Sequence, residues 1–291
     1  MRGEAMRYAL FLGCTVPARQ MNYEQSARAV AEALDIEFVD LPFGCCGFPL
    51  EPISRVKAFA MAAHNLMRAS EEHLDVVTLC SACAETLVKT RWLLSHEENL
   101  LRRVNKELNP LGVEYGGEAP RVLHILRVLH DEVGVENIRR RIERPLSGLR
   151  VAVHYGCHYM RPSEAYGGFE DPERPRSLDE LVEATGAESV DYPGKMDCCG
   201  GALLAMSEDV AKEMAAKKLK RLSALNVDAL ILICPFCAIM YDRYQSLILE
   251  EGRIPVLYYT QLLGLALGLE PDALGLDLNA VSVEDLLAKV M

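Results

Sequence analysis

Ten cysteines fall into two sets with the same internal order, and this doubling constrains the fold more than any other feature of the chain. The offset between matching members is 143 for the first cysteine, 153 for the adjacent pair and 154 for the last two. Such a pattern indicates an internal duplication with an insertion, which must be recognised before a fold is assigned. The first set is Cys14, Cys45, Cys46, Cys80 and Cys83, and the second is Cys157, Cys198, Cys199, Cys234 and Cys237.

The sequence around the cysteines repeats as well. "RYALFLGC" matches "RVAVHYGC", "IEFVDLPFGCCG" matches "ESVDYPGKMDCCG", and "VVTLCSAC" matches "LILICPFC". Each of these segments contains a short apolar, β-rich run that ends near its cysteine, and segments with helical spacing lie between them at 23–35, 54–73, 177–186 and 207–226. This alternation predicts an α/β fold of two repeats, each a small, mainly parallel sheet with flanking helices. The cysteines are then expected at the carboxyl ends of strands, where open α/β sheets bind ligands.

The segment between the two sets is expected to be helical and to link the halves. It runs over 84–135, from "AETLVKTRWLLSHEENLLRRVNKEL" through "RVLHILRVLHDEV", and "NPLGVEYGGEAP" breaks it with glycine and proline. We place the domain boundary at "RPLSG", which gives an N-terminal domain at 1–145 and a C-terminal domain at 146–291. A strand at 254–260 and a helix at 261–269 are expected to close the second half.

Length, charge and hydrophobicity define the setting. The 291 residues, half of them hydrophobic, suffice for one large core or two domains. No run reaches the roughly 18–20 apolar residues of a membrane span, and "MRGEAMRYAL" lacks the apolar stretch of a signal peptide, so a cytoplasmic location is expected. The net charge of −11 disfavours a nucleic-acid partner. In a reducing compartment, ten cysteines indicate metal ligands or redox groups.

Each half offers five thiols, one more than the commonest metal centres use. "CSAC" and "CPFC" alone fit a zinc half-site or a thioredoxin-like pair, but zinc and a cubane 4Fe-4S cluster each take four protein ligands. Adjacent cysteines can reach one object only where the chain turns, and Gly47, Gly200 and Gly201 permit that turn. The pattern therefore predicts iron-sulfur clusters that are not plain cubanes. Structural zinc sites with spare thiols, and a vicinal disulfide, are the alternatives.

Several segments resemble the cysteine-rich CCG family, and most closely the B subunits of heterodisulfide reductases. They are "YALFLGC", "HYGCHYMRP" at 154–162, "MDCCGG", "CPFC" with "YDR" shortly after it, and "PVLYYTQLLGLALGL". The resemblance implies two noncubane 4Fe-4S clusters, one on each set of five cysteines, that face each other across a pseudo-twofold interface. It implies cleavage or formation of a small-molecule disulfide between them, such as the mixed disulfide of coenzymes M and B.

The same resemblance implies partner proteins in a larger complex. A small protein with cubane clusters, similar to the C subunits of heterodisulfide reductases, would deliver electrons. A flavin-containing protein, similar to their A subunits, would in turn supply electrons to that small protein. The chain contains neither a Walker-type phosphate loop nor a GxGxxG fingerprint, so flavin or nicotinamide is expected on another chain of the complex. The alternative functions are an electron-transfer iron-sulfur subunit of a quinone- or 2-hydroxy-acid-linked dehydrogenase and a structural zinc-binding module.

Two histidines flank Cys157 and are the predicted catalytic residues. His154 and His158 could deliver protons to departing thiolates, because imidazole titrates near neutral pH. The alternative is a histidine that is only hydrogen-bonded or packed in the core. Three basic residues close to cluster cysteines could bind an anionic substrate: Lys195, Arg161 and Arg19. The alternative for each of them is a solvated side chain. The basic run "KKLKRL" at 217–222 is expected to be a solvated helix face.

Overall fold

The chain folds into two four-stranded parallel sheets, as a computed structural model shows for residues 6–116 and 119–291. The first sheet has the order β2-β1-β3-β4 and the second the order β6-β5-β7-β8. The first contains β1 (Met6–Phe11), β2 (Ile36–Asp40), β3 (Asp75–Thr78) and β4 (Val122–His124), and the second β5 (Arg150–His154), β6 (Glu188–Val190), β7 (Ala229–Leu232) and β8 (Val256–Tyr258). The predicted α/β fold of two repeats is confirmed. The start of "MRGEAMRYAL" and part of the predicted break, residues 117–118, lie outside the described residues.

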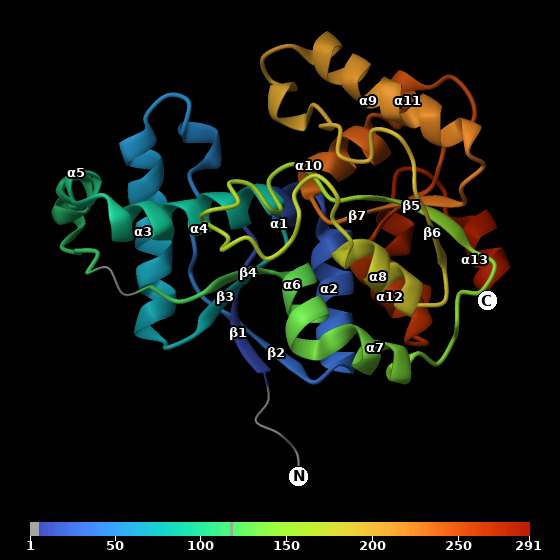
Figure 1. Cartoon of the computed structure of the whole chain (residues 1–291), viewed down its shortest axis with the longest axis horizontal. Helices are drawn as coiled ribbons and strands as arrows, with labels where there is room; N and C mark the ends of the chain where they lie inside the picture. The colour runs from blue at the N-terminus through green and yellow to red at the C-terminus, as the bar shows by residue number, and fades with distance from the viewer. Residues whose placement is uncertain (1–5, 117–118) are drawn as a thin grey trace.

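Helices cover both sheets (Figure 1). The first half contains α1 (Thr15–Arg19), α2 (Met21–Ala33), α3 (Arg55–Glu71), α4 (Ser81–His96), α5 (Glu98–Leu108), α6 (Ile125–Arg127), a π-helical stretch at Val128–Gly134, and α7 (Val135–Arg141). The second contains α8 (Ser177–Ala184), α9 (Glu208–Ala224), α10 (Pro235–Ala238), a π-helical stretch at Ile239–Arg243, α11 (Gln245–Ile248), α12 (Tyr259–Ala266) and α13 (Glu284–Val290). The predicted helices at 23–35, 54–73, 177–186 and 207–226 correspond to α2, α3, α8 and α9. Within the described part of the chain, none of the helices combines the length and apolarity needed to cross a bilayer.

The pairing of the strands repeats down to single residues. In the first sheet Arg7 lies opposite Glu37, and in the second Arg150 lies opposite Glu188. Both rungs form an ion pair, with N–O distances of 3.0 and 3.3 Å. The duplication therefore preserves the strand register, which fixes where each strand ends.

The fourth strand of the first sheet corrects the expectation of a wholly helical linker. Val122–His124 forms β4 and pairs with β3, so the helical prediction for "RVLHILRVLHDEV" is wrong over these three residues. A short apolar run does not distinguish a strand from a buried helix by periodicity alone. The matching segment "PVLYYTQLL", which forms β8 and α12, carries the signal that could have identified β4.

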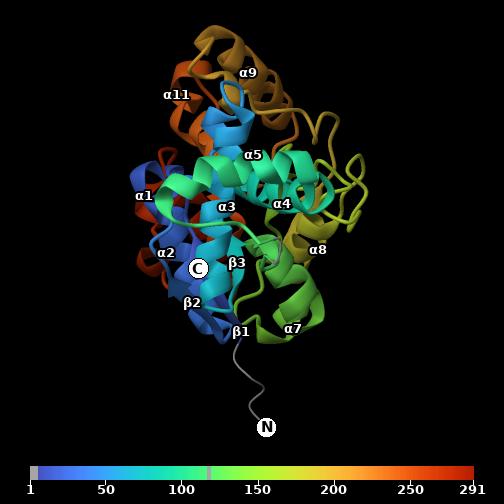
Figure 2. The same cartoon turned by 90° about the vertical axis from the view of Figure 1, so that its left-hand side faces the viewer.

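The helical segment directly after the fourth strand of each half packs against the other half. α12 of the second half packs on α2 of the first, and α7 with the π-helical stretch before it packs on α8 (Figure 1). A hydrogen bond of 2.7 Å joins the hydroxyls of Ser26 and Thr260 at the first contact, and His130 Nε2 lies 3.0 Å from a carboxylate oxygen of Glu180 at the second. In Figure 2, α4 and α5 lie above the labelled strands of the first sheet, and α9 and α11 lie above α4 and α5. The contacts of α12 with α2 and of α7 with α8 bring the carboxyl edges of the two sheets together.

Candidate metal centre

All ten cysteines follow the carboxyl ends of strands, as the sequence predicts. Cys14 follows β1, the Cys45–Cys46 pair follows β2, and Cys80 follows β3. The second half repeats this placement after β5, β6 and β7 with Cys157, the Cys198–Cys199 pair and Cys234. Cys83 and Cys237 lie in the first turn of the next helix, α4 or α10. The strand order therefore collects five sulfurs at one edge of each sheet.

The helix starts after β3 and β7 supply backbone donors to the sulfurs. Cys80 caps α4 with φ −123° and ψ 121°, and Cys234 caps α10 with φ −132° and ψ 128°. The backbone N–H of Cys83 donates to the Cys80 sulfur, and that of Cys237 donates to the Cys234 sulfur. N–H groups at the start of a helix have no intrahelical partner, so they favour a negatively charged thiolate.

Glycines make the turn that lets adjacent cysteines serve one site. Gly47 and Gly200 have φ of +94° and +81°, a region that residues with a Cβ rarely adopt. A Cβ at Gly47 would lie 2.5 Å from the carbonyl oxygen of Ala58, and one at Gly200 would lie 2.9 Å from that of Ala211. The N–H groups of Gly47 and Gly200 each donate to a sulfur at 3.4 Å. The turn expected at both positions is therefore present.

The thiols form one continuous run across the interface between the halves. The sulfurs interact in series, in the order Cys14, Cys45, Cys46, Cys83 and Cys80 in the first half, and in the matching order Cys157, Cys198, Cys199, Cys237 and Cys234 in the second. Cys237 Sγ lies 3.4 Å from Cys199 Sγ. A contact between Cys80 and Cys234 connects the two runs. All ten thiols are free. The run contains every cysteine that the sequence assigned to a cluster.

The chemistry of these donors fits an iron-sulfur group. Interactions with Cys45 and Cys83 lower the pKa of Cys46 to about 4, and those with Cys157 and Cys199 lower the pKa of Cys198 to about 2, whereas interactions with neighbouring thiols and burial raise the pKa of Cys83 and Cys237. The thiolate is the form that binds metal. Sites built of thiolates alone suit zinc or iron-sulfur clusters better than oxygen-preferring ions, and zinc closes its shell with four ligands.

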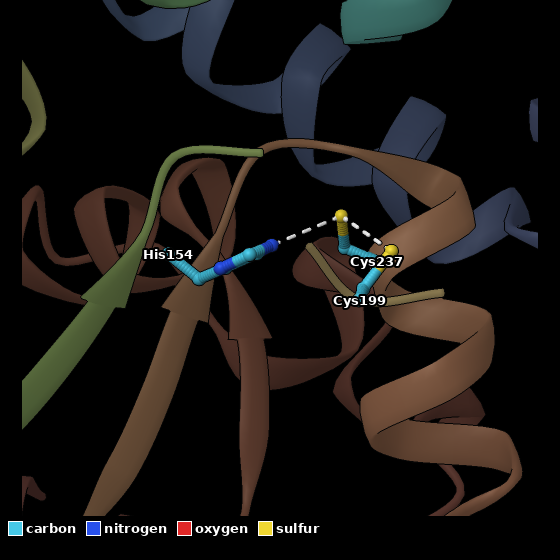
Figure 3. Close-up of side chains that lie close together, drawn as sticks. All are labelled: His154, Cys199 and Cys237. Carbon is cyan, nitrogen blue, oxygen red and sulfur yellow. Dashed lines mark hydrogen bonds between the residues drawn. The ribbon is translucent and has the colours of Figure 1, made fainter. Parts of the chain in front are cut away.

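His154 lies behind the second set of cysteines and is buried, with 1% of its surface exposed. Its Nε2 is 3.2 Å from Cys237 Sγ (Figure 3), and its Nδ1 is 2.7 Å from Lys218 Nζ. Burial lowers the pKa of His154 well below its usual value, and the charge of Lys218 lowers it further. Because an ammonium group can only donate, Nδ1 accepts, Nε2 carries the proton, and the imidazole donates to the Cys237 sulfur.

Sequence reasoning missed Lys218. Its neighbours Lys217 and Lys220 are exposed, as expected for "KKLKRL", but Lys218 is 1% exposed, so the prediction of a solvated face is wrong at this position. The signal that could have identified it is its helical spacing from buried Ala211 and Ala215, which places it on the inner face of α9.

His158 lies in the cavity beside the second set of cysteines. Its side chain is 34% exposed, its Nδ1 is 3.8 Å from Oε2 of buried Glu85, and its ring meets that of Phe48 edge-on at 5.0 Å. The cavity has a volume of about 60 Å³ and is lined from both halves by Phe48, Ser81, Ala82, Gly156, Cys157, His158, Cys198, Cys199, Ala202, Cys234, Phe236 and Cys237. His158 is therefore the predicted catalytic residue that faces this space.

A groove of about 850 Å³ adjoins the cavity and shares Phe48, Ala202 and Phe236 with it. Of the three basic residues suggested by the sequence, Arg19 lines the groove. Lys195 is bound to buried Asp179 at 2.7 Å, and Arg161 is bound to Glu173 at 2.6 Å. Arg55, which sequence reasoning did not single out, also lines the groove.

Known proteins share both the sequence pattern and the fold. Residues 8–88 and 151–242 each match the model of the cysteine-rich domain called CCG. The chain is 38% identical over 293 residues to the B subunit of the ferredoxin:CoB-CoM heterodisulfide reductase of Methanosarcina mazei, covering 98% of this chain and 97% of that protein. It is 31% identical over 288 residues to the 8-methylmenaquinol:fumarate reductase membrane anchor subunit of Wolinella succinogenes, covering 96% and 98%.

A solved structure supports the fold alone. The crystal structure of a hypothetical protein from Helicobacter pylori superposes with a TM-score of 0.74 at 15% identity. The match covers 97% of this chain and 53% of that one, so this chain spans about half the length of that protein.

Proposed function

This chain belongs to the cysteine-rich CCG domain family, and from that premise we propose that it is the iron-sulfur catalytic subunit of a heterodisulfide reductase-type complex. The observation that carries the proposal is the run of ten free thiols that continues from one half to the other beside a cavity lined by both. The relative from M. mazei, named for its action on CoB-CoM heterodisulfide, supports this function over nearly the whole chain.

The cofactors we propose are two noncubane 4Fe-4S clusters. Cys14, Cys45, Cys46, Cys80 and Cys83 would hold one, and Cys157, Cys198, Cys199, Cys234 and Cys237 would hold the other. When bound, such clusters supply one-electron carriers, and a disulfide needs two electrons and two protons to become two thiols. The electrons would come from a partner protein with cubane clusters, itself supplied by a flavoprotein of the same complex.

The residues of this chain would bind and protonate the substrate. The cavity would hold the disulfide beside cysteines from the second half, and the groove would admit the rest of the molecule. His158 faces the cavity, with its Nδ1 3.8 Å from Glu85, and would give a proton to a departing thiolate. His154 is the second candidate for proton delivery, from behind Cys237. Arg19 at the groove would attract an anionic group.

A second function is favoured by the relative from W. succinogenes. Its name describes a subunit of a reductase that uses 8-methylmenaquinol, and its similarity extends over 96% of this chain. As an electron-transfer subunit of that kind, the chain would relay electrons and release no thiol. A structural zinc module is less consistent with five thiols in each set, because zinc takes four ligands.

The test is a thiol assay on anaerobically purified protein. We expect about eight iron atoms per chain, and two thiols released for every two electrons supplied with the mixed disulfide of coenzymes M and B. Changing His158→Asn should lower turnover about 100-fold, whereas His96→Asn, at an exposed position, should not. Iron without thiol release would favour the electron-transfer function, and zinc in place of iron would overturn both.

A further inference from the structure

The two cysteine sites differ in the layer of residues directly behind them. The offset of 143 that relates Gly13 to Gly156 also relates Phe11 to His154, the last residues of β1 and β5. The offset of 153 that relates Ala58 to Ala211, the neighbours of the turn glycines, also relates Asn65 to Lys218. The first site is therefore backed by a phenylalanine and an amide, and the second by a histidine and a lysine.

Lys218 is the one lysine or arginine that is buried among residues 6–116 and 119–291. Its Nζ donates to the carbonyl of Lys195 at 2.8 Å and to His154 Nδ1 at 2.7 Å. It also lies 5.8 Å from the ring centres of Tyr192 and Tyr241. None of these partners carries a negative charge, so hydrogen bonding does not neutralise the ammonium group.

The thiols of the second set and one aspartate face Lys218. Cys237, Cys199 and Cys198 raise the pKa of Lys218, against the larger effect of burial, which lowers it to about 8. Asp197 acts in the same direction as the thiols, but it is itself paired with Arg221 at 2.8 Å. Among the described residues, Lys218 forms no salt bridge with a carboxylate, so its buried amino group faces the cysteines without a carboxylate partner of its own.

The first site shows that a charge is not needed to build the loop. Asn65 accepts from the backbone N–H of Gly44 at 2.8 Å and donates to the carbonyl of Cys45 at 3.0 Å, so it braces the loop before the cysteine pair as Lys218 does. Phe11 fills the place of His154 and packs on Phe43, with ring centres 5.1 Å apart. Bracing is common to both halves, whereas the buried lysine and the hydrogen bond from an imidazole N–H to a sulfur belong to the second.

We propose that Lys218 and His154 act as positioning residues that raise the reduction potential of the cluster on the second set of cysteines above that of the first. This inference rests on the proposed function, since it requires both clusters. A buried positive charge stabilises the added electron, because electrostatic interactions are strong in a low-dielectric interior. Net charge and hydrogen bonds to sulfur are two factors that set cluster potentials. The second cluster is then the site where the first electron resides.

The test is a redox titration of the whole chain followed by electron paramagnetic resonance. A Cys198→Ser, Cys199→Ser double variant identifies the signal of the second cluster. Lys218→Met should lower the midpoint potential of that signal by about 59 mV, a tenfold change in a one-electron equilibrium, and leave the other signal in place. Lys220→Met, which removes an exposed charge from the same helix, should shift neither.

His154→Phe is the second variant, because it introduces the residue that the first half carries at this position. It should move the same signal in the same direction by removing the N–H···S hydrogen bond. Equal shifts in Lys218→Met and Lys220→Met, movement of both signals, or identical wild-type midpoints would each overturn the inference. Absence of iron in the wild-type chain would instead overturn the proposed function, so the two failures are distinguishable.

Discussion

The N-terminal and C-terminal cysteine sites have the same backbone and different surroundings. Both place five sulfurs after three strands, use a left-handed glycine after the adjacent pair, and cap a helix with the fourth cysteine. Behind the sulfurs, Phe11 and Asn65 of one site correspond to His154 and Lys218 of the other. Strand ends and turns fix where the sulfurs lie, whereas the residues behind the sulfurs differ between the two sites and change the electrostatic environment of each.

The largest expected effect tests whether the two sites are independent. Changing Cys45 and Cys46 to serine, or Cys198 and Cys199 to serine, should each lower the iron content from about eight to about four atoms per chain. The reason is that each pair belongs to a different set of five cysteines. Iron and acid-labile sulfide analysis of anaerobically purified protein measures this. Loss of all iron in either variant would show that one site needs the other, through the contact between Cys80 and Cys234.

The next effect compares the two turn glycines. Gly47→Ala should destabilise the protein by about 3 kcal/mol and Gly200→Ala by about 2 kcal/mol, because both residues have positive φ and the new Cβ meets backbone oxygen at 2.5 and 2.9 Å. Gly112→Ala, also at positive φ but with open space around the Cβ, should cost about 1 kcal/mol. Denaturant unfolding gives the three values. Equal costs at all three positions would contradict the close packing of the turns.

The smallest effect concerns the last residues of β4 and β8, His124 and Tyr258. Burial lowers the pKa of His124 to about 4, whereas burial raises that of Tyr258, so only His124 titrates differently in the folded and unfolded states at mildly acidic pH. The unfolded state takes up the proton first as pH falls below about 6.5, so His124 should cost about 1.5 kcal/mol of stability between pH 6.5 and 5. His124→Gln should remove this loss, and Tyr258→Phe should keep it.

The measurement is the free energy of unfolding as a function of pH. Identical pH dependence in the wild type and His124→Gln would mean that the histidine is solvated in the native state, against its hydrogen bond to the carbonyl of Ile233 at 3.0 Å.

Sequence reasoning predicted the cysteine placement because strand ends, glycine turns and helix starts are all local features. It missed β4, since three residues, two of them apolar, fit either a strand or a helix. It also missed Lys218, because a charge pattern does not report which face of a helix is covered by other elements. The link between Cys80 and Cys234 joins residues from different halves, so it depends on how the sheets pack. The features that could not be predicted from the sequence are mainly those that depend on tertiary packing.

The helices that pack against the opposite half bear on how such a chain could arise. The segment after β4 in the first half packs on α8 of the second half, and α12 of the second half packs on α2 of the first. Two copies of a single-repeat ancestor could make both contacts as a symmetric dimer, but every substitution would then appear twice. Fusion into one polypeptide removes that constraint, so a lysine can be acquired on one side while an asparagine is retained on the other. The covalent link thus permits the two sites to be unequal, and under the proposed function this difference would favour electron transfer toward the second site.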